Sequence, residues 1–392
     1  MLRVHDPFLR GQLATAALFT ALGFQYATWA SRVPALKAAL GLTAAEVGML
    51  LMSAGIGAAA SFPLVAFLMR RMGSRRLALA STLGLTLVLP ALAVAPNYPT
   101  ALLVLCADGV LVGCLNTAMN AQGSALETTY GRNTMAKLHA TFSGGSFAAA
   151  LLASGMNAFT ASVLTHFGVA ALLLVLLAAC AHGGLLSDAA PAAPQARKTR
   201  PRWSIPAGAT LWMCCAMAFG TVAEGAMNDW STLYMEEVAL ASEQVAPLGI
   251  AVVSGMMVVA RLFADGWRSR LGDGKVVVLG SALAGAGLGA ALLSGGVIPA
   301  LLGFAIMGLG IAAVTPCVYA AAARRSSDTL TLVATMGTVG LLAGPPVIGF
   351  VAHATNLAWG LGLVCLCAFV VTLCGSRITW EAAAPREQLT GS

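Results

Sequence analysis

The chain has few charged residues. Asp, Glu, Lys and Arg make up 9% of its 392 residues, whereas hydrophobic residues make up 58%. A soluble globular domain carries about 25% charged residues, so this composition excludes an ordinary cytosolic enzyme and indicates a membrane protein. It also excludes disorder, which needs low hydrophobicity and high charge.

Motifs for metal binding, cofactor binding and covalent catalysis are missing as well. The nine cysteines show no CxxC spacing, so we expect neither disulfides nor a zinc or redox site. The sequence also has no His/Glu metal box, glycine-rich phosphate loop or nucleophile elbow. We therefore expect no metal, no cofactor and no enzyme activity.

The sequence contains several long runs without a charged residue. The runs 138–187, 276–323 and 329–376 each hold 48 to 50 residues without Asp, Glu, Lys or Arg. A helical crossing needs about 20 residues, so each run predicts two crossings joined by a turn. The whole chain predicts an all-α membrane protein with twelve transmembrane helices. Their expected ranges are 11–31, 46–69, 77–95, 100–122, 137–157, 163–183, 208–231, 246–265, 276–294, 298–320, 330–352 and 357–376.

The basic residues predict the orientation of these helices. With the N-terminus inside, 20 of the 22 Lys and Arg residues fall on the cytoplasmic side, and only Arg32 and Lys37 fall outside. This asymmetry predicts a multi-pass protein with both termini in the cytoplasm. The basic loops thus act as topology determinants beside membrane lipid, and we expect no nucleic-acid partner.

A polar segment divides the chain into two halves. We expect an N-terminal six-helix bundle at 1–183, a cytoplasmic linker at 184–207, a C-terminal six-helix bundle at 208–376 and a cytoplasmic tail at 377–392. The halves echo one another at an offset near 199 residues, for example in the turns 72–77 and 271–276. Parallel six-helix repeats of this kind place a binding site near the midplane, where the repeats meet.

A basic turn follows the second expected helix. It resembles the Gly-x-x-x-Asp-Arg-x-Gly-Arg-Arg signature of the major facilitator superfamily, with Ala66 and Arg70 in place of the glycine and the aspartate. The resemblance implies a gate here and at the repeat-related turn of the second half. The residues it implies for this gate are Arg71, Gly73, Arg75, Arg76, Arg261, Asp265, Arg268 and Arg270.

Two further segments, 29–34 and 224–231, resemble a bacterial branch of that superfamily with MosC-like and fucose-permease-like members. The similarity covers essentially the whole chain. It implies two pseudo-symmetric six-helix bundles that rock about a cavity lined by the first, fourth, seventh and tenth helices. It also implies a location in the bacterial inner membrane, and we expect the chain to act as a monomer.

Ionisable side chains inside the expected helices are the proton-coupling candidates, because an ionised group in hydrocarbon costs several kcal/mol. Asp108 lies about eight residues into its helix, near the midplane. Glu224 lies in the outer half of the seventh helix, and His139 opens the fifth. Asp108 and His139 have a structural alternative, namely a hydrogen bond that joins neighbouring helices, and Glu224 has one as a packing residue.

Polar side chains on the same helices are the substrate-binding candidates. Gln25, Trp29 and Arg32 recur at helical spacing with Tyr26 alongside, which predicts a wall facing the solute. Arg32 has an alternative role at lipid headgroups, and Asp229 has one as an anchor at the helix end. The remaining candidates are Asn116, Asn120, Asn228, Asp229, Thr315 and Tyr319.

In family terms we expect proton-coupled transport of a small polar solute, such as a sugar or polyol, by alternating access. Proton-driven efflux of an amphiphilic or drug-like compound is the alternative. It is disfavoured because the fifth helix lacks the proline of the Gly-Pro-rich signature that efflux members carry. A membrane sensor or scaffold that transports nothing is an alternative of another class.

Overall fold

The computed structural model describes residues 6–187 and 208–380, without the side chain of Asp265. The described residues form helices and turns and no strand. The helices are α1 (Pro7–Ala30), α2 (Val33–Leu40), α3 (Ala44–Ala93), α4 (Tyr98–Tyr130), α5 (Met135–Phe159), α6 (Val163–His182), α7 (Gly208–Glu237), α8 (Leu248–Leu271), α9 (Asp273–Ser294), α10 (Val297–Ile311), α11 (Val314–Arg325), α12 (Ser327–Ala354) and α13 (Leu357–Arg377).

Twelve crossings are found among these helices, as predicted. Eight stretches of the described residues are long and apolar enough to cross a membrane, counting α3 once and α10 with α11 as one. The 50 residues of α3 hold two crossings that meet at Gly73, whose φ of 75° and ψ of 171° are non-helical. The less apolar helices α1, α5 and α8 have 24, 25 and 24 residues and provide the other three.

Two features differ from the prediction. The helix α2 was not predicted, because eight residues are too few to give a clear periodic signal; it begins at Val33–Pro34 and ends at Gly41 in the left-handed region. The tenth predicted helix is broken at Ala312–Ala313 into α10 and α11. The expected linker and tail lie largely outside the described residues.

The start of α3 shows how local chemistry sets a helix boundary. The Thr43 hydroxyl accepts a hydrogen bond from the Glu46 backbone N–H (3.2 Å), and the Glu46 carboxylate accepts one from the Thr43 backbone N–H (2.8 Å). These two bonds satisfy backbone donors that a helix N-terminus otherwise leaves unpaired. Thr43 and Glu46 therefore form a capping box that fixes the first residue of α3.

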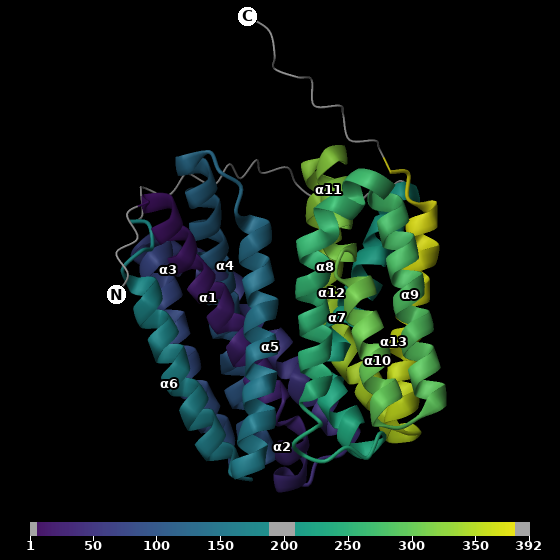
Figure 1. The fold of residues 1–392 in the computed structure, drawn as a ribbon. Coiled ribbons are helices and arrows are strands. Elements are labelled where there is room, and N and C mark those ends of the chain that lie inside the picture. Colours follow the sequence, from purple (N-terminus) through teal and green to yellow (C-terminus); the bar gives the residue numbers. More distant parts are fainter. Residues whose placement is uncertain (1–5, 188–207, 381–392) are drawn as a thin grey trace, which may run out of the picture.

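The crossings form two bundles that stand side by side (Figure 1). The N-terminal bundle contains α1 and α3–α6, and the C-terminal bundle contains α7–α13; α2 lies at one end of the molecule. We name the end where α1 begins and α13 ends the terminal face, and the opposite end the α2 face.

The bundles meet along a seam where α3 packs against α12 and α5 against α8. At the α2 face a Cβ on Gly48 would lie 2.7 Å from the carbonyl oxygen of Pro345, so the two backbones touch there. Lys37 forms an ion pair with Glu237 across the seam, and Asn157 donates a hydrogen bond to the carbonyl oxygen of Glu243 (2.5 Å). The seam is therefore closed at the α2 face.

Side chains at the terminal face bond within their own bundle. Arg75 donates to the carbonyl oxygen of His182 (2.9 Å) in the N-terminal bundle. Asp273 accepts from Arg268 (2.8 Å) and Arg324 (2.9 Å) in the C-terminal bundle. In the described parts of the chain, no hydrogen bond or ion pair joins the bundles at this face. The polar links between the bundles lie in the middle of the seam and at the α2 face.

Candidate functional site

Asp108 is buried in the N-terminal bundle, with 2% of its surface exposed. It lies ten residues after the first residue of α4, or about 15 Å from the α2-face end at about 1.5 Å per residue. Its Oδ1 accepts a hydrogen bond from the side-chain amide of Gln25 on α1 (2.6 Å). Two predicted residues thus form one buried pair between α1 and α4.

Asp229 forms a second buried carboxylate pair, and this one joins the two bundles. The hydroxyl of Tyr26 on α1 donates a hydrogen bond to Asp229 Oδ1 on α7. Asp229 is 5% exposed, and the Tyr26 ring packs edge to face on Trp29 with centroids 5.2 Å apart. Asp229 is therefore not an anchor at a helix end: it is buried, and α7 continues for eight residues beyond it.

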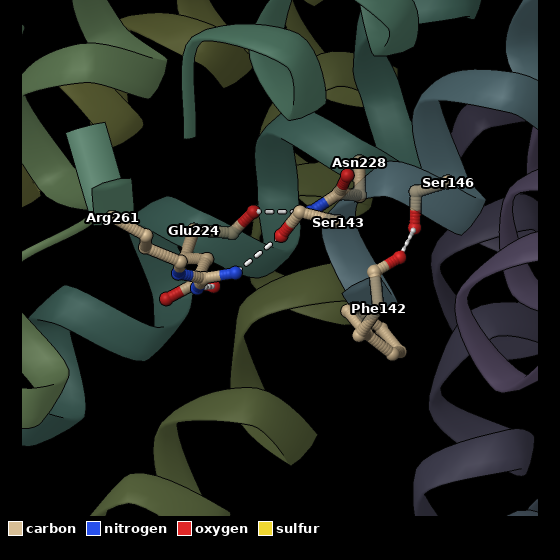
Figure 2. Close-up of polar contacts among 6 residues, drawn as sticks. All are labelled: Phe142, Ser143, Ser146, Glu224, Asn228 and Arg261. Atoms are coloured by element: carbon tan, nitrogen blue, oxygen red, sulfur yellow. Dashed lines mark hydrogen bonds and ion pairs between the residues drawn. The ribbon is translucent and has the colours of Figure 1, made fainter. Parts of the chain in front are cut away.

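Glu224 is paired with a cation instead. Arg261 on α8 forms an ion pair with the Glu224 carboxylate (3.0 Å), and its other terminal nitrogen donates to the hydroxyl of Ser143 on α5. Figure 2 shows these side chains together, with Asn228 one turn from Glu224 on α7. The Asn228 amide donates to the backbone carbonyl of Glu224 (3.0 Å). Arg261 therefore links both bundles from the middle of the seam.

The three carboxylates differ in what holds them. Glu224 has a guanidinium partner, whereas Asp108 and Asp229 accept their bonds from an uncharged amide and an uncharged hydroxyl. The described residues include no salt bridge to either aspartate. A buried carboxylate with neutral donors is poorly compensated when ionised, which makes proton binding at these two positions chemically favourable.

The helical spacing predicts that Arg32 and Gln25 face the solute from one wall, and this prediction is wrong for Arg32. It is 3% exposed, and its Nε donates to Nδ1 of His166 on α6 (3.1 Å). Gln25 is directed at α4 and Arg32 at α6, because Arg32 lies in the turn between α1 and α2, where helical spacing no longer applies. Trp29 is buried in the core between them.

The amides of α4 lie on an accessible face. Asn116 is exposed, and the side-chain amide of Asn120 donates to Asn116 Oδ1 (3.0 Å). Ser124 continues the stripe toward the terminal face, one turn further on. Two carboxamides and a hydroxyl along one helix face are costly in hydrocarbon and suit a face that water reaches.

The remaining candidates are less central. Thr315 and Tyr319 on α11 are half-buried. His139 is exposed on α5, and its ring packs edge to face on Phe19 with centroids 5.1 Å apart. No described contact joins these residues to the three carboxylates.

The implied gate residues do not all lie at the terminal face. Gly73 forms the turn between the two crossings of α3, Arg75 bonds His182, and the Arg71 guanidinium lies over the Phe67 ring. Arg76 and Arg270 are exposed, and Arg268 pairs with Asp273. Arg261 differs: it lies about 15 Å before the end of α8, beside Glu224. The side chain of Asp265 lies outside the description.

Comparisons with known proteins identify the family. The model of the Major Facilitator Superfamily matches residues 13–331. An uncharacterized MFS-type transporter of Yersinia pestis is 31% identical over 95% of this chain and 97% of its own length. Membrane protein MosC of Rhizobium meliloti is 30% identical over 93% of this chain and 88% of its own length.

Solved structures share the fold at low sequence identity. The nucleoside transporter NupG superposes with a TM-score of 0.71 at 15% identity, over 95% of this chain and 99% of its own. The E. coli fucose:proton symporter FucP superposes with a TM-score of 0.62 at 15% identity, over 96% of this chain and 100% of its own. With the twelve crossings and the relatives together, the chain belongs to the Major Facilitator Superfamily and is a membrane transporter, not an enzyme.

Proposed function

We propose that this transporter moves a small hydroxylated solute together with protons across the bacterial inner membrane, with both termini in the cytoplasm. The orientation is supported by the basic residues. Of the 16 Lys and Arg residues in the described parts of the chain, 13 lie at or near the terminal-face ends of the crossings, whereas Arg32 and Lys37 lie at the α2 face and Arg261 lies in the middle of the seam. In this orientation the closed α2 face is the outer one. The structure then corresponds to an inward-facing state.

Proton coupling is supported chiefly by the neutral partners of Asp108 and Asp229. Burial at the depth of the hydrocarbon core disfavours a charged carboxylate that has no cation beside it. Each aspartate therefore gains from binding a proton while it is buried and from releasing it when water arrives. Glu224 is not assigned to proton binding, because Arg261 already compensates its charge.

A neutral solute is supported by the polar side chains on the accessible face of α4. The accessible amides of Asn116 and Asn120 supply donors and acceptors without charge, which matches hydroxyl groups. The two solved structures that share the fold are a nucleoside transporter and a fucose:proton symporter, and nucleosides and fucose both carry hydroxylated sugar rings. These points together support a small hydroxylated solute as the substrate.

Transport by purified protein in proteoliposomes tests the proposal. A thermal-shift screen over sugars, nucleosides, polyols and amphiphilic drugs supplies the solute. Asp108→Asn and Asp229→Asn keep the side-chain shape and lose titration, so we expect both to abolish uptake driven by a pH gradient while solute exchange at equal pH continues. Asp6→Asn is the matched control, because Asp6 is exposed at the terminal face and pairs with Arg132.

Three results would overturn parts of this proposal. Full gradient-driven uptake by both aspartate variants would remove the proton role. Binding restricted to amphiphilic drugs would favour the efflux alternative. Ligand binding without any flux would favour a sensor.

A further inference from the structure

A groove at the terminal face lies between the adjoining ends of α8, α9 and α13. The residues of its lining that matter here are Arg268, Ser269, Lys275, Val278, Leu279 and Trp380. Because α8 ends and α9 begins at this turn, the groove lies where two crossings leave the hydrocarbon. It is therefore level with the lipid headgroups.

One wall of the groove is apolar. Leu279 is 59% exposed and Val278 is half-buried. Trp380 is fixed against the groove because its indole N–H donates to the carbonyl oxygen of Gly375 (2.8 Å). A Cβ on Gly274 would lie 2.6 Å from the Trp380 ring, so only glycine leaves room for it. The wall presents an aromatic and an aliphatic surface next to the polar rim.

The rim of the groove is cationic. Lys275 is exposed, and within the described residues it makes no ion pair. Asp273 is the acidic residue of the lining, and its two carboxylate oxygens each accept from an arginine, Arg268 or Arg324. The first backbone N–H groups of α9 also lack intrahelical acceptors here. The rim thus favours an anion despite the carboxylate.

We propose that this groove binds an anionic phospholipid, with the phosphate at Lys275 and an acyl chain along Leu279 and Trp380. Basic pockets between transmembrane helices bind anionic headgroups, and tryptophan is favoured at this depth. A soluble phosphate compound would use the rim and leave the apolar wall empty. The combination of both surfaces selects a lipid.

Binding of short-chain phosphatidylglycerol to the full-length protein in detergent tests this site, with phosphatidylcholine and inorganic phosphate as the other ligands. Lys275→Gln is expected to weaken phosphatidylglycerol binding about fivefold, because one cation near an anionic lipid surface contributes about that factor. Trp380→Ala is expected to weaken it further without changing the binding of inorganic phosphate. Lys137→Gln, at an exposed lysine on the same face of the other bundle, is the control.

Equal phosphatidylglycerol affinity of the Lys275→Gln variant and the unaltered protein would overturn the assignment. So would equal affinity for phosphatidylcholine and phosphatidylglycerol. Inorganic phosphate that competes fully, together with no effect of Trp380→Ala, would identify a free-phosphate site instead. Because Lys275 is exposed, its substitution keeps the test valid even if Trp380→Ala fails to fold.

Discussion

Replacing Tyr26 by Phe removes one oxygen atom from the middle of the seam. The ring that packs on Trp29 stays, while the hydrogen bond from α1 to Asp229 on α7 is lost. This bond joins the two bundles, so it stabilises only conformations in which they are close together at this level. We therefore expect Tyr26→Phe to shift the equilibrium toward the state that is open at the α2 face.

The size of the shift depends on the charge of Asp229. A hydrogen bond to a charged group contributes about 1.5–3 kcal/mol and one between neutral groups about 0.5–1.5 kcal/mol. The ratio of open to closed molecules should rise roughly 10- to 150-fold with an ionised carboxylate and roughly 2- to 10-fold with a protonated one. The effect of Tyr26→Phe should thus be largest at high pH and diminish as the pH falls and Asp229 takes up a proton.

Pulsed electron paramagnetic resonance measures this ratio directly. Spin labels at Ala38 and Ser242, both exposed at the α2 face on opposite sides of the seam, can be attached through encoded azide residues that leave the native cysteines in place. Tyr98→Phe is the matched control, because the Tyr98 hydroxyl donates to the Glu46 carbonyl (3.1 Å) within one bundle. An equal shift in both variants, or a shift that grows at low pH, would refute the reasoning.

Two further predictions concern the same seam. Gly48→Ala places a Cβ 2.7 Å from the Pro345 carbonyl oxygen and should shift the equilibrium toward the state open at the α2 face by about 1–3 kcal/mol. The distance between the same two spin labels checks this shift. Gly144→Ala is the control and should not change the distance, because its Cβ meets no atom within 4 Å. Arg261→Lys keeps the charge, but an ammonium group cannot bond Glu224 and Ser143 at the same time as the two guanidinium nitrogens do. Solute flux should therefore fall about as much as in Ser143→Ala. The double variant should be no slower than the slower single variant. Additive losses in that double variant would mean that the Arg261–Ser143 bond does not matter for transport.

Much of the fold was predictable, because hydrocarbon imposes long apolar helices. Runs without charge were enough to predict the twelve crossings. The short helix α2 and the break between α10 and α11 left no comparable signal. Hydropathy also says little about how each helix is rotated, which is why Arg32 and His166, 134 residues apart, could not be paired in advance.

The candidate site was predictable in its members and not in its pairings. The cost of a buried carboxylate selected Asp108, and the structure joins it to Gln25, another predicted residue. Asp229 was expected near a helix end because α7 was predicted to stop at residue 231. The helix continues to Glu237, which places Asp229 about 12 Å inside it. A boundary error of six residues therefore hid a buried carboxylate.

The polar contacts in the middle of the seam respond differently when the bundles part. Arg261 loses Ser143 but keeps Glu224, because both belong to the C-terminal bundle, so its charge stays compensated in either conformation. Asp229 loses Tyr26, its one described side-chain partner, because that residue belongs to the other bundle. A buried carboxylate left without a donor costs more than a paired one unless it takes up a proton or water reaches it. Separation of the bundles at this level is thereby linked to the protonation or hydration of Asp229, whereas Arg261 and Glu224 can pass through the same movement unchanged.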